Sequence, residues 1–350
     1  MTNTSTRTSL VPLFRNIAAC IAVLLLVALT PRPVRAQWTW HAAVGAQSKD
    51  LGHQALAFLP NELWIHEGDT VTWKFEVDEI HTVTFLKTDP AAQNRPPFPV
   101  GCPGFNPVPG PATFDGTTCV TTPPLMKNAH FSVTFPKKGN YKVVCLVHEN
   151  MTGVVHVLDP LAHLPFDQED YNDRAADQRR DILSDDDRDN DHDGHRGHHE
   201  ARDEHHGGHN VVAGSGEVTA NGGGSQTLSI MRFDHDTITI RRGGTVEWTN
   251  DDPVTPHTIT FGTEPGDPMP PSGSVPITND ADGARHATIT LADSAHSGFI
   301  VAAPQERLFL PQSPLGVTRF RVTFSQAGTY PYICALHDGL GMKGKIIVLP

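Results

Sequence analysis

Short runs of alternating apolar and polar residues recur along the chain and predict β-strands. Such runs cover 63–73 and 80–85 in the first part of the sequence, and 238–248 and 256–261 in the second. A period of two is typical of strands with one buried face, and the glycines between the runs predict turns. Many short strands of this kind predict an all-β protein built from antiparallel sandwiches.

The two parts of the sequence repeat one another, which indicates a duplicated domain. In each part a Val-Thr-Phe run is followed, at identical spacing, by a glycine, a tyrosine and a cysteine. These residues are Val133-Thr134-Phe135, Gly139, Tyr141 and Cys145 in the first copy and Val322-Thr323-Phe324, Gly328, Tyr330 and Cys334 in the second. We therefore predict one domain over 37–158 and a second over 216–350.

The segment 159–215 differs in composition from both domains. It is rich in Asp, Glu and His and has almost no aliphatic residues after Leu183. Such a segment cannot bury enough apolar surface to offset the entropy lost when the chain is ordered. We predict that it is a disordered, His- and Asp-rich linker between the domains.

The segment 1–36 has the features of a secretory signal peptide. Arg7 and Arg15 precede an apolar run over 17–29, no acidic residue is present, and the segment ends in Ala36. This order predicts cleavage after Ala36 and export to the periplasm or the exterior. An uncleaved anchor is the alternative, but the apolar run is short for a bilayer span. The mature chain is not expected to insert stably in a membrane.

The charge of the chain bears on its partners. The sequence has 39 acidic residues against 27 Lys and Arg, so its formal net charge is −12. Nucleic-acid binding rests on a basic surface, so this charge argues against it. Negative charge is instead suited to steering a cationic protein partner.

Each domain ends in a loop that carries three potential metal ligands, and a histidine lies upstream on a predicted strand. The residues are His81, Cys145, His148 and Met151 in the first domain and His257, Cys334, His337 and Met342 in the second. Two imidazoles and a thiolate with a weak axial thioether suit copper that cycles between Cu(I) and Cu(II). A buried free cysteine beside a structural histidine and a core methionine is the alternative for each loop.

These residues resemble those of the cupredoxins, the blue-copper proteins. The first loop has the ligand spacing of amicyanin, and the second has that of plastocyanin and pseudoazurin. The resemblance covers about 54–158 and 230–350, and implies two Greek-key β-sandwiches, each with one type 1 copper held by the four residues named above. Glu149 remains an alternative to Met151 as a ligand. The resemblance also implies that His148 and His337 lie near the surface, where electrons enter or leave.

Two further cysteines, Cys102 and Cys119, lie in a Pro/Gly-rich stretch of the first domain that a minimal cupredoxin lacks. In an oxidising compartment we expect them to form a disulfide. A second metal site is the alternative, although no pair of histidines lies nearby in the sequence.

The resemblance and the residues around the cysteines favour electron transfer over catalysis. Multicopper oxidases need additional histidines, usually as His-x-His pairs and beside the type 1 cysteine. Here the neighbours of the two cysteines are apolar, and neither domain contains a His-x-His pair. We therefore expect an exported protein with two type 1 coppers that exchanges electrons with redox protein partners and is not an enzyme.

Histidines of the linker support a second hypothesis, a copper-sequestering or copper-delivery protein. The residues are His192, His195, His198, His199, His205, His206 and His209. Imidazoles suit copper, so this tract could gather metal weakly. A solvated spacer is the alternative.

Overall fold

Burial follows the alternating sequence pattern in the strands. In a computed structural model, which describes residues 1, 36–87, 111–192, 208–302 and 318–350, strand β4 (Thr70–Phe75) buries Val71, Trp73 and Phe75 and exposes Lys74. Residues from Trp38 to Pro350 form one compact unit. The predicted signal segment lies almost wholly outside the described residues. No described helix is both long and apolar enough to cross a membrane.

The first domain is a sandwich of two sheets. One has the strand order β2-β1-β4-β8-β6 and the other β3-β10-β9-β5-β7. A core containing Trp73 from one sheet and Val143 from the other lies between them. Besides β4, the strands are β1 (Thr39–Gln47), β2 (His53–Leu59), β3 (Glu62–His66), β5 (Thr84–Phe85), β6 (Pro111–Thr113), β7 (Val120–Thr121), β8 (His130–Thr134), β9 (Gly139–Val144) and β10 (Thr152–Leu158).

The second domain repeats this arrangement. Its sheets have the orders β17-β18-β20-β14-β11-β12 and β13-β22-β21-β15-β19-β16, with Trp248 and Tyr332 in the core between them. The elements are β11 (Gly208–Asn221), β12 (Gly224–Phe233), β13 (Thr237–Arg241), β14 (Thr245–Asp251), β15 (Thr260–Phe261), β16 (Ser272–Gly273), β17 (Thr278–Asn279), β18 (Arg285–Ile289), β19 (Ala295–His296), β20 (Arg319–Phe324), β21 (Gly328–Ile333), the short 3₁₀ helix η3 (Asp338–Leu340) and β22 (Lys343–Leu349). The prediction of two β-sandwich domains is confirmed.

The two domains share a sheet. Strand β12 pairs with β2 in antiparallel register, from Thr227 opposite Leu56 to Ile230 opposite His53. This pairing joins one sheet of each sandwich into a continuous sheet of 11 strands. The segment 159–215, predicted as a disordered linker, therefore does not leave the domains independent of one another, because backbone hydrogen bonds connect them directly.

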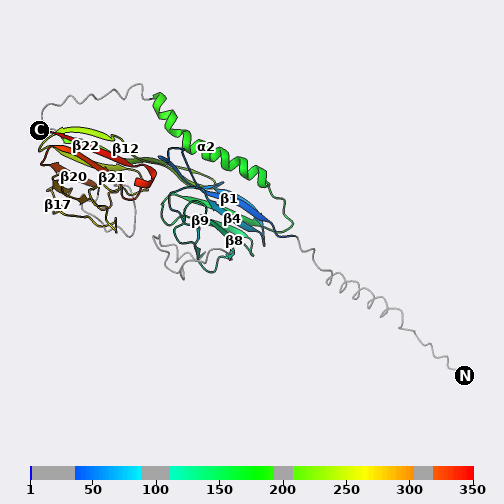
Figure 1. Cartoon of the computed structure of the whole chain (residues 1–350). Helices are drawn as coiled ribbons and strands as arrows, with labels where there is room; N and C mark the ends of the chain where they lie inside the picture. The colour runs from blue at the N-terminus through cyan, green and yellow to red at the C-terminus, as the bar shows by residue number, and fades with distance from the viewer. Residues whose placement is uncertain (2–35, 88–110, 193–207, 303–317) are drawn as a thin grey trace. The chain divides into compact units, whose positions relative to one another are not determined.

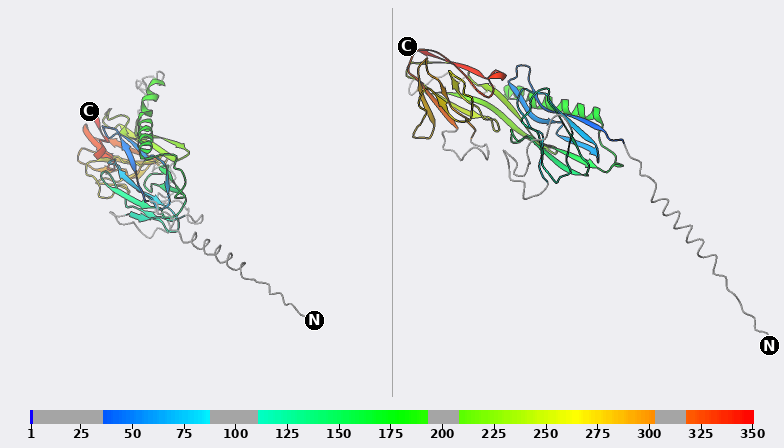
Figure 2. Two further views of the ribbon diagram at one scale, coloured as in Figure 1. Left: turned by 90° about the vertical axis from the view of Figure 1, so that its right-hand side faces the viewer. Right: turned by 60° about the horizontal axis from the view of Figure 1, so that its bottom comes forward.

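Part of the predicted disordered linker is a helix, α2 (Gln168–His192), that packs along β1 and β2 (Figure 1 and Figure 2). The Asp167 side chain accepts hydrogen bonds from the amides of Glu169 and Asp170 and so caps its first turn. Tyr171 and Ile182 of this helix are buried. Disorder over 159–215 is therefore wrong for α2 and for the start of β11, whereas 193–207 lies outside the described residues.

Tyr171 fixes α2 to the first sandwich through the backbone of β3. Its hydroxyl accepts a hydrogen bond from the Trp64 amide (2.7 Å) and donates one to the Trp64 carbonyl (2.8 Å). Burial raises the pKa of Tyr171 to about 12, so the phenol stays protonated and keeps its donor. The helix thus satisfies two polar groups of an edge strand, which the composition of the segment does not reveal.

We predict that Tyr171→Phe lowers the free energy of unfolding by about 1–3 kcal/mol, because two half-buried backbone groups of Trp64 lose their partner. Urea denaturation measures the change. Leu161→Ala, at a side chain that is 86% exposed, is the control and should change stability by less than about 0.5 kcal/mol. Equal stability of Tyr171→Phe and the wild type would mean that α2 is not docked in solution.

Candidate metal centres

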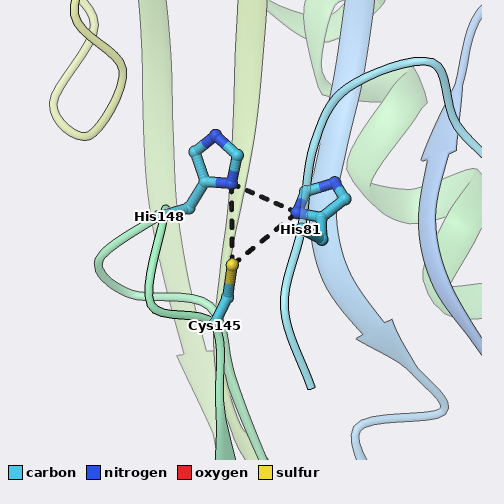
Figure 3. A group of neighbouring side chains, drawn as sticks. All are labelled: His81, Cys145 and His148. Carbon is cyan, nitrogen blue, oxygen red and sulfur yellow. Dashed lines mark hydrogen bonds between the residues drawn. The ribbon is translucent and has the colours of Figure 1, made fainter. Parts of the chain in front are cut away.

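The first group of candidate ligands converges at one end of the first sandwich. Cys145 follows β9, His148 lies in the loop before β10, and His81 is held by an isolated antiparallel bridge to Leu125. The Cys145 Sγ lies 3.9 Å from His81 Nδ1 and 3.8 Å from His148 Nδ1, and the two Nδ1 atoms are 3.1 Å apart. Both rings turn Nδ1 toward the sulfur (Figure 3).

The second group repeats this geometry. Cys334 follows β21, His337 precedes η3, and His257 forms an isolated bridge with Ile300. The Cys334 Sγ lies 3.8 Å from His257 Nδ1 and 3.4 Å from His337 Nδ1, and the two Nδ1 atoms are again 3.1 Å apart. Within the described ranges, these two are the groups in which at least three such donors lie together.

The size of each triangle fits a bound metal ion. The point equidistant from the three donor atoms lies about 2 Å from each of them, and metal–nitrogen and metal–sulfur bonds are about 2.0–2.3 Å long. Two ring nitrogens and one sulfur are also the donor set of trigonal copper sites. The donors therefore fit copper in both chemistry and spacing.

Each predicted axial methionine lies in the same loop as its cysteine. Met151 and Met342 are fully buried. The Cys145 amide donates to the Met151 carbonyl (3.0 Å), and the Cys334 amide donates to the Met342 carbonyl (3.1 Å). These bonds close the two loops although they differ in length, because the longer second loop takes up η3 between His337 and Met342.

The surroundings of both cysteines lower the pKa of the thiol and so favour the thiolate. Burial alone would raise the pKa of Cys145, but hydrogen bonds from His148 and His81 and the charges on these rings hold it well below its usual value. The pKa of Cys334 is lowered in the same way: burial opposes the shift, and His337 and His257 outweigh it. The thiolate is the form that binds metal, so each pocket favours the ligand form of its cysteine.

A threonine after each upstream histidine fixes the sulfur. The Thr82 amide donates to Cys145 Sγ (3.4 Å), and the Thr258 amide donates to Cys334 Sγ (3.3 Å). The hydroxyl of Thr82 accepts from the Leu146 amide (2.8 Å), and that of Thr258 accepts from the Ala335 amide (2.7 Å). Hydrogen bonds to the sulfur tune the potential of such a site, so this pair belongs to the centres.

A glycine bulge packs on the ring of each upstream histidine. Gly45 in β1 and Gly214 in β11 lie where the strand register shifts, and have φ of 72° and 82°. A Cβ on Gly214 would lie 2.1 Å from His257 Nε2, and one on Gly45 would lie 3.1 Å from His81 Nε2. Only glycine allows both this backbone conformation and this approach.

The loop histidines are buried, which corrects the expectation that they lie near the surface. His148 is 2% exposed and His337 is 3% exposed. Glu79, which is 6% exposed, contacts both: its Oε1 lies 3.3 Å from His148 Nε2, and its Oε2 lies 3.6 Å from His337 Nε2. The joined sheets bring the two rings to one carboxylate and withdraw both from solvent.

The positive charges of the histidines around Glu79 compensate for the burial of its carboxylate. Burial alone would raise the pKa of Glu79, but the hydrogen bond from His148 and the charges of His337, His148 and His81 lower it to about 2. The pKa of His148 is raised to about 9, because Cys145 and Glu79 outweigh its burial. Glu79 is therefore an anion between two domains.

In the second centre a further carboxylate, that of Asp252, contacts the upstream histidine, His257. Asp252 Oδ2 lies 3.7 Å from His257 Nε2, and both side chains are fully buried. Burial would lower the pKa of His257, but Asp252 and Cys334 raise it to about 9. Within the described residues neither His257 Nε2 nor the matching atom of the first centre, His81 Nε2, has a hydrogen-bond partner, so the contact of His257 with Asp252 is an ion pair. The two centres therefore share their donors and differ in the groups around them.

The remaining predicted residues are placed only in part. Cys119 is disulfide-bonded, and its expected partner Cys102 lies outside the described residues. Cys145 and Cys334 are free thiols. Of the linker histidines, His192 ends α2, and His209 lies in β11 opposite Val246 of β14. The others, His195, His198, His199, His205 and His206, lie outside the described residues.

Sequence reasoning missed several residues that shape the centres. Thr82 and Thr258 carry a usable signal, because each follows the upstream histidine of its repeat. The signal of Gly45 and Gly214 is weaker, since their distances to the histidine differ. Glu79 carries no such repeat signal, since the residue at the matching position, two before His257, is Thr255.

Comparisons with known proteins agree with this geometry. The family model described as copper binding proteins, plastocyanin/azurin family, matches residues 46–158 and 217–349. A plastocyanin of Synechococcus is 30% identical over 118 residues, which are 33% of this chain and 62% of that protein. A chloroplastic plastocyanin of Tetradesmus obliquus is 30% identical over 116 residues, 33% of this chain and 57% of that protein. The chain thus spans about three fifths of the length of these relatives.

Solved structures to which the chain is similar include the oxidised plastocyanin of Dryopteris crassirhizoma. It is 21% identical, covers 40% of this chain over 99% of its own length, and has a TM-score of 0.22.

Each segment matched by the family model contains one complete His–Cys–His group. The two groups, one in each domain, fit two type 1 copper sites. The chain therefore belongs to the plastocyanin/azurin family of copper-binding proteins.

Proposed function

We propose that this protein is an exported electron carrier with two type 1 copper centres. The first is held by His81, Cys145, His148 and Met151, and the second by His257, Cys334, His337 and Met342. The observation that carries the proposal is the pair of buried His–Cys–His triangles, each with an amide hydrogen bond to its sulfur. Copper held in this way supplies a one-electron couple when bound. The protein's part is to fix donors that suit both oxidation states.

The surroundings of the donors support electron transfer over catalysis. The residues beside the two cysteines, Val144 and Leu146 in one domain and Ile333 and Ala335 in the other, cannot ligate a further metal. The donor residues are buried, and an amide hydrogen bond holds each sulfur in place, which reduces the rearrangement that accompanies each electron. We propose that the protein exchanges electrons with redox protein partners and does not itself transform a substrate.

The disulfide at Cys119 supports export. Disulfides persist in oxidising compartments such as the periplasm and the exterior, and are rare in the cytosol. The signal-like segment 1–36 points to the same compartments.

We predict that the purified protein binds two copper ions tightly per chain, one at each triangle. Replacing His195, His198, His199, His205 and His206 together by glutamine should leave both ions bound, because these residues lie outside the two groups. Metal analysis after dialysis against a weak chelator measures the ratio. A loss of tight copper in this variant would favour the sequestering hypothesis over the carrier.

Each thiolate should produce its own charge-transfer absorption in the visible spectrum. We expect Cys145→Ser to abolish the absorption of the first centre and Cys334→Ser that of the second, because a hydroxyl oxygen replaces the soft sulfur donor poorly. The wild-type spectrum should equal the sum of the two single-variant spectra. An unchanged spectrum in either variant would disprove that centre.

Gly214→Ala should damage the second centre alone. The new Cβ would meet His257 Nε2 at 2.1 Å, and the backbone there is left-handed. We expect the copper affinity of the second centre to fall by about 10–100-fold while the first keeps its spectrum. Gly339→Ala is the matched control, since a Cβ there meets nothing within 4 Å although Gly339 lies close to His337 in sequence. Equal effects of the two substitutions would contradict the role of the bulge.

A further inference from the structure

The junction between the two domains holds a group that neither centre needs for ligation. Glu79 lies two residues before His81, yet its carboxylate faces the loop histidines of both domains. One oxygen is directed to His148 Nε2 and the other to His337 Nε2. In each ring the opposite nitrogen, Nδ1, belongs to the His–Cys–His triangle. A continuous series of groups thus runs from one triangle to the other.

The chemistry of the three groups is complementary. An imidazole that binds metal through Nδ1 keeps its proton on Nε2, so each ring presents a donor to the junction. An ionised carboxylate accepts at both oxygens, and can therefore serve both donors at once. The second domain has Thr255 in the position equivalent to Glu79. Among the described residues the two rings therefore share the single carboxylate of Glu79 and do not face two that would repel each other.

Burial removes the competing solvent. Glu79, His148 and His337 are each at most 6% exposed. Placing an anion there is costly unless it is paired, so the carboxylate must have compensating partners. The neighbouring strand pairing of β12 with β2 fixes the two domains, and the side chain of Val254 from the second domain lies in the core of the first. The contact is therefore part of the folded chain and not a passing encounter.

We propose that Glu79 is an electron bridge that joins the two copper centres through His148 and His337. This inference rests on the proposed function. With copper held by the two ligand sets, Glu79 would pass one electron between His148 and His337, so that one centre would be oxidised as the other is reduced and no atom would be transferred. Glu79 lies 3.3 Å from His148 and 3.6 Å from His337, so it fills the space between the two rings. Electronic coupling between two centres falls steeply with the width of any through-space gap, and these short contacts keep each gap small.

The first test uses the metal-free protein. In Glu79→Gln the side chain keeps its shape but presents an oxygen to one ring and an NH₂ group to the other, so it cannot accept from both. We expect the Nε2 resonances of His148 and His337 to move in ¹⁵N NMR spectra, while that of His156 stays in place. Glu62→Gln is the matched control, because Glu62 Oε1 contacts His156 Nε2 at 3.1 Å, and it should move His156 alone. If Glu79→Gln moved only one of the two loop histidines, or neither, the bridge would not exist.

The second test uses the copper-loaded full chain. After a flash reduces one centre, the electron should redistribute at a rate that does not depend on protein concentration. We expect Glu79→Gln and Glu79→Ala to slow this step by about tenfold or more, with both charge-transfer bands present, and Glu62→Gln to leave it unchanged. Potentials recorded for each variant separate a change in driving force from a change in coupling. An unchanged rate in both Glu79 variants with two intact centres would overturn the bridge and leave the carrier function standing, whereas missing charge-transfer bands in the wild type would overturn the carrier function itself.

Discussion

The antiparallel pairing of β2 with β12 is the interaction on which the placement of the two centres depends. In a free sandwich both strands would be sheet edges with unpaired backbone groups, and the pairing covers both edges at once. Side chains reinforce the junction: Asn61 donates to Asn221, and Arg232 donates to the carbonyls of Asp50 and Leu340. The Leu340 carbonyl belongs to η3 in the ligand loop of the second centre, so this arginine ties that loop to the first domain.

Duplication followed by divergence explains why the centres share donors but not surroundings. The triangles, the threonines that hold the sulfurs and the glycine bulges recur in both domains. The carboxylates do not: Asp252 faces the upstream histidine of the second centre, whereas Glu79 faces the loop histidines of both. Hydrogen bonding to the ligands and the length of the loop tune the potential of a type 1 site. Under the proposed function, two centres built on one plan would differ in potential without any change of ligand.

The sequence predicts what is local and misses what arises between distant segments. Strand alternation and the repeated His, Cys and Met residues predict the two sandwiches and bring together both His–Cys–His groups, because these patterns lie within single strands and loops. The helix α2 escapes prediction because its buried face consists of few residues, such as Tyr171 and Ile182, among many charges. The burial of His148 and His337 cannot be predicted from the sequence either. It depends on pairing between strands more than 160 residues apart, and no residue pattern indicates the register of that pairing.

The central claim is that the two centres lie in one fixed arrangement across this junction. Dipolar electron paramagnetic resonance on the fully oxidised, two-copper protein in frozen solution measures the distance between the centres directly. A junction held by β2, β12 and Glu79 predicts one narrow distance distribution that is the same with and without the histidine substitutions in 193–207. A broad distribution, as expected for two domains moving on a tether, would contradict the account.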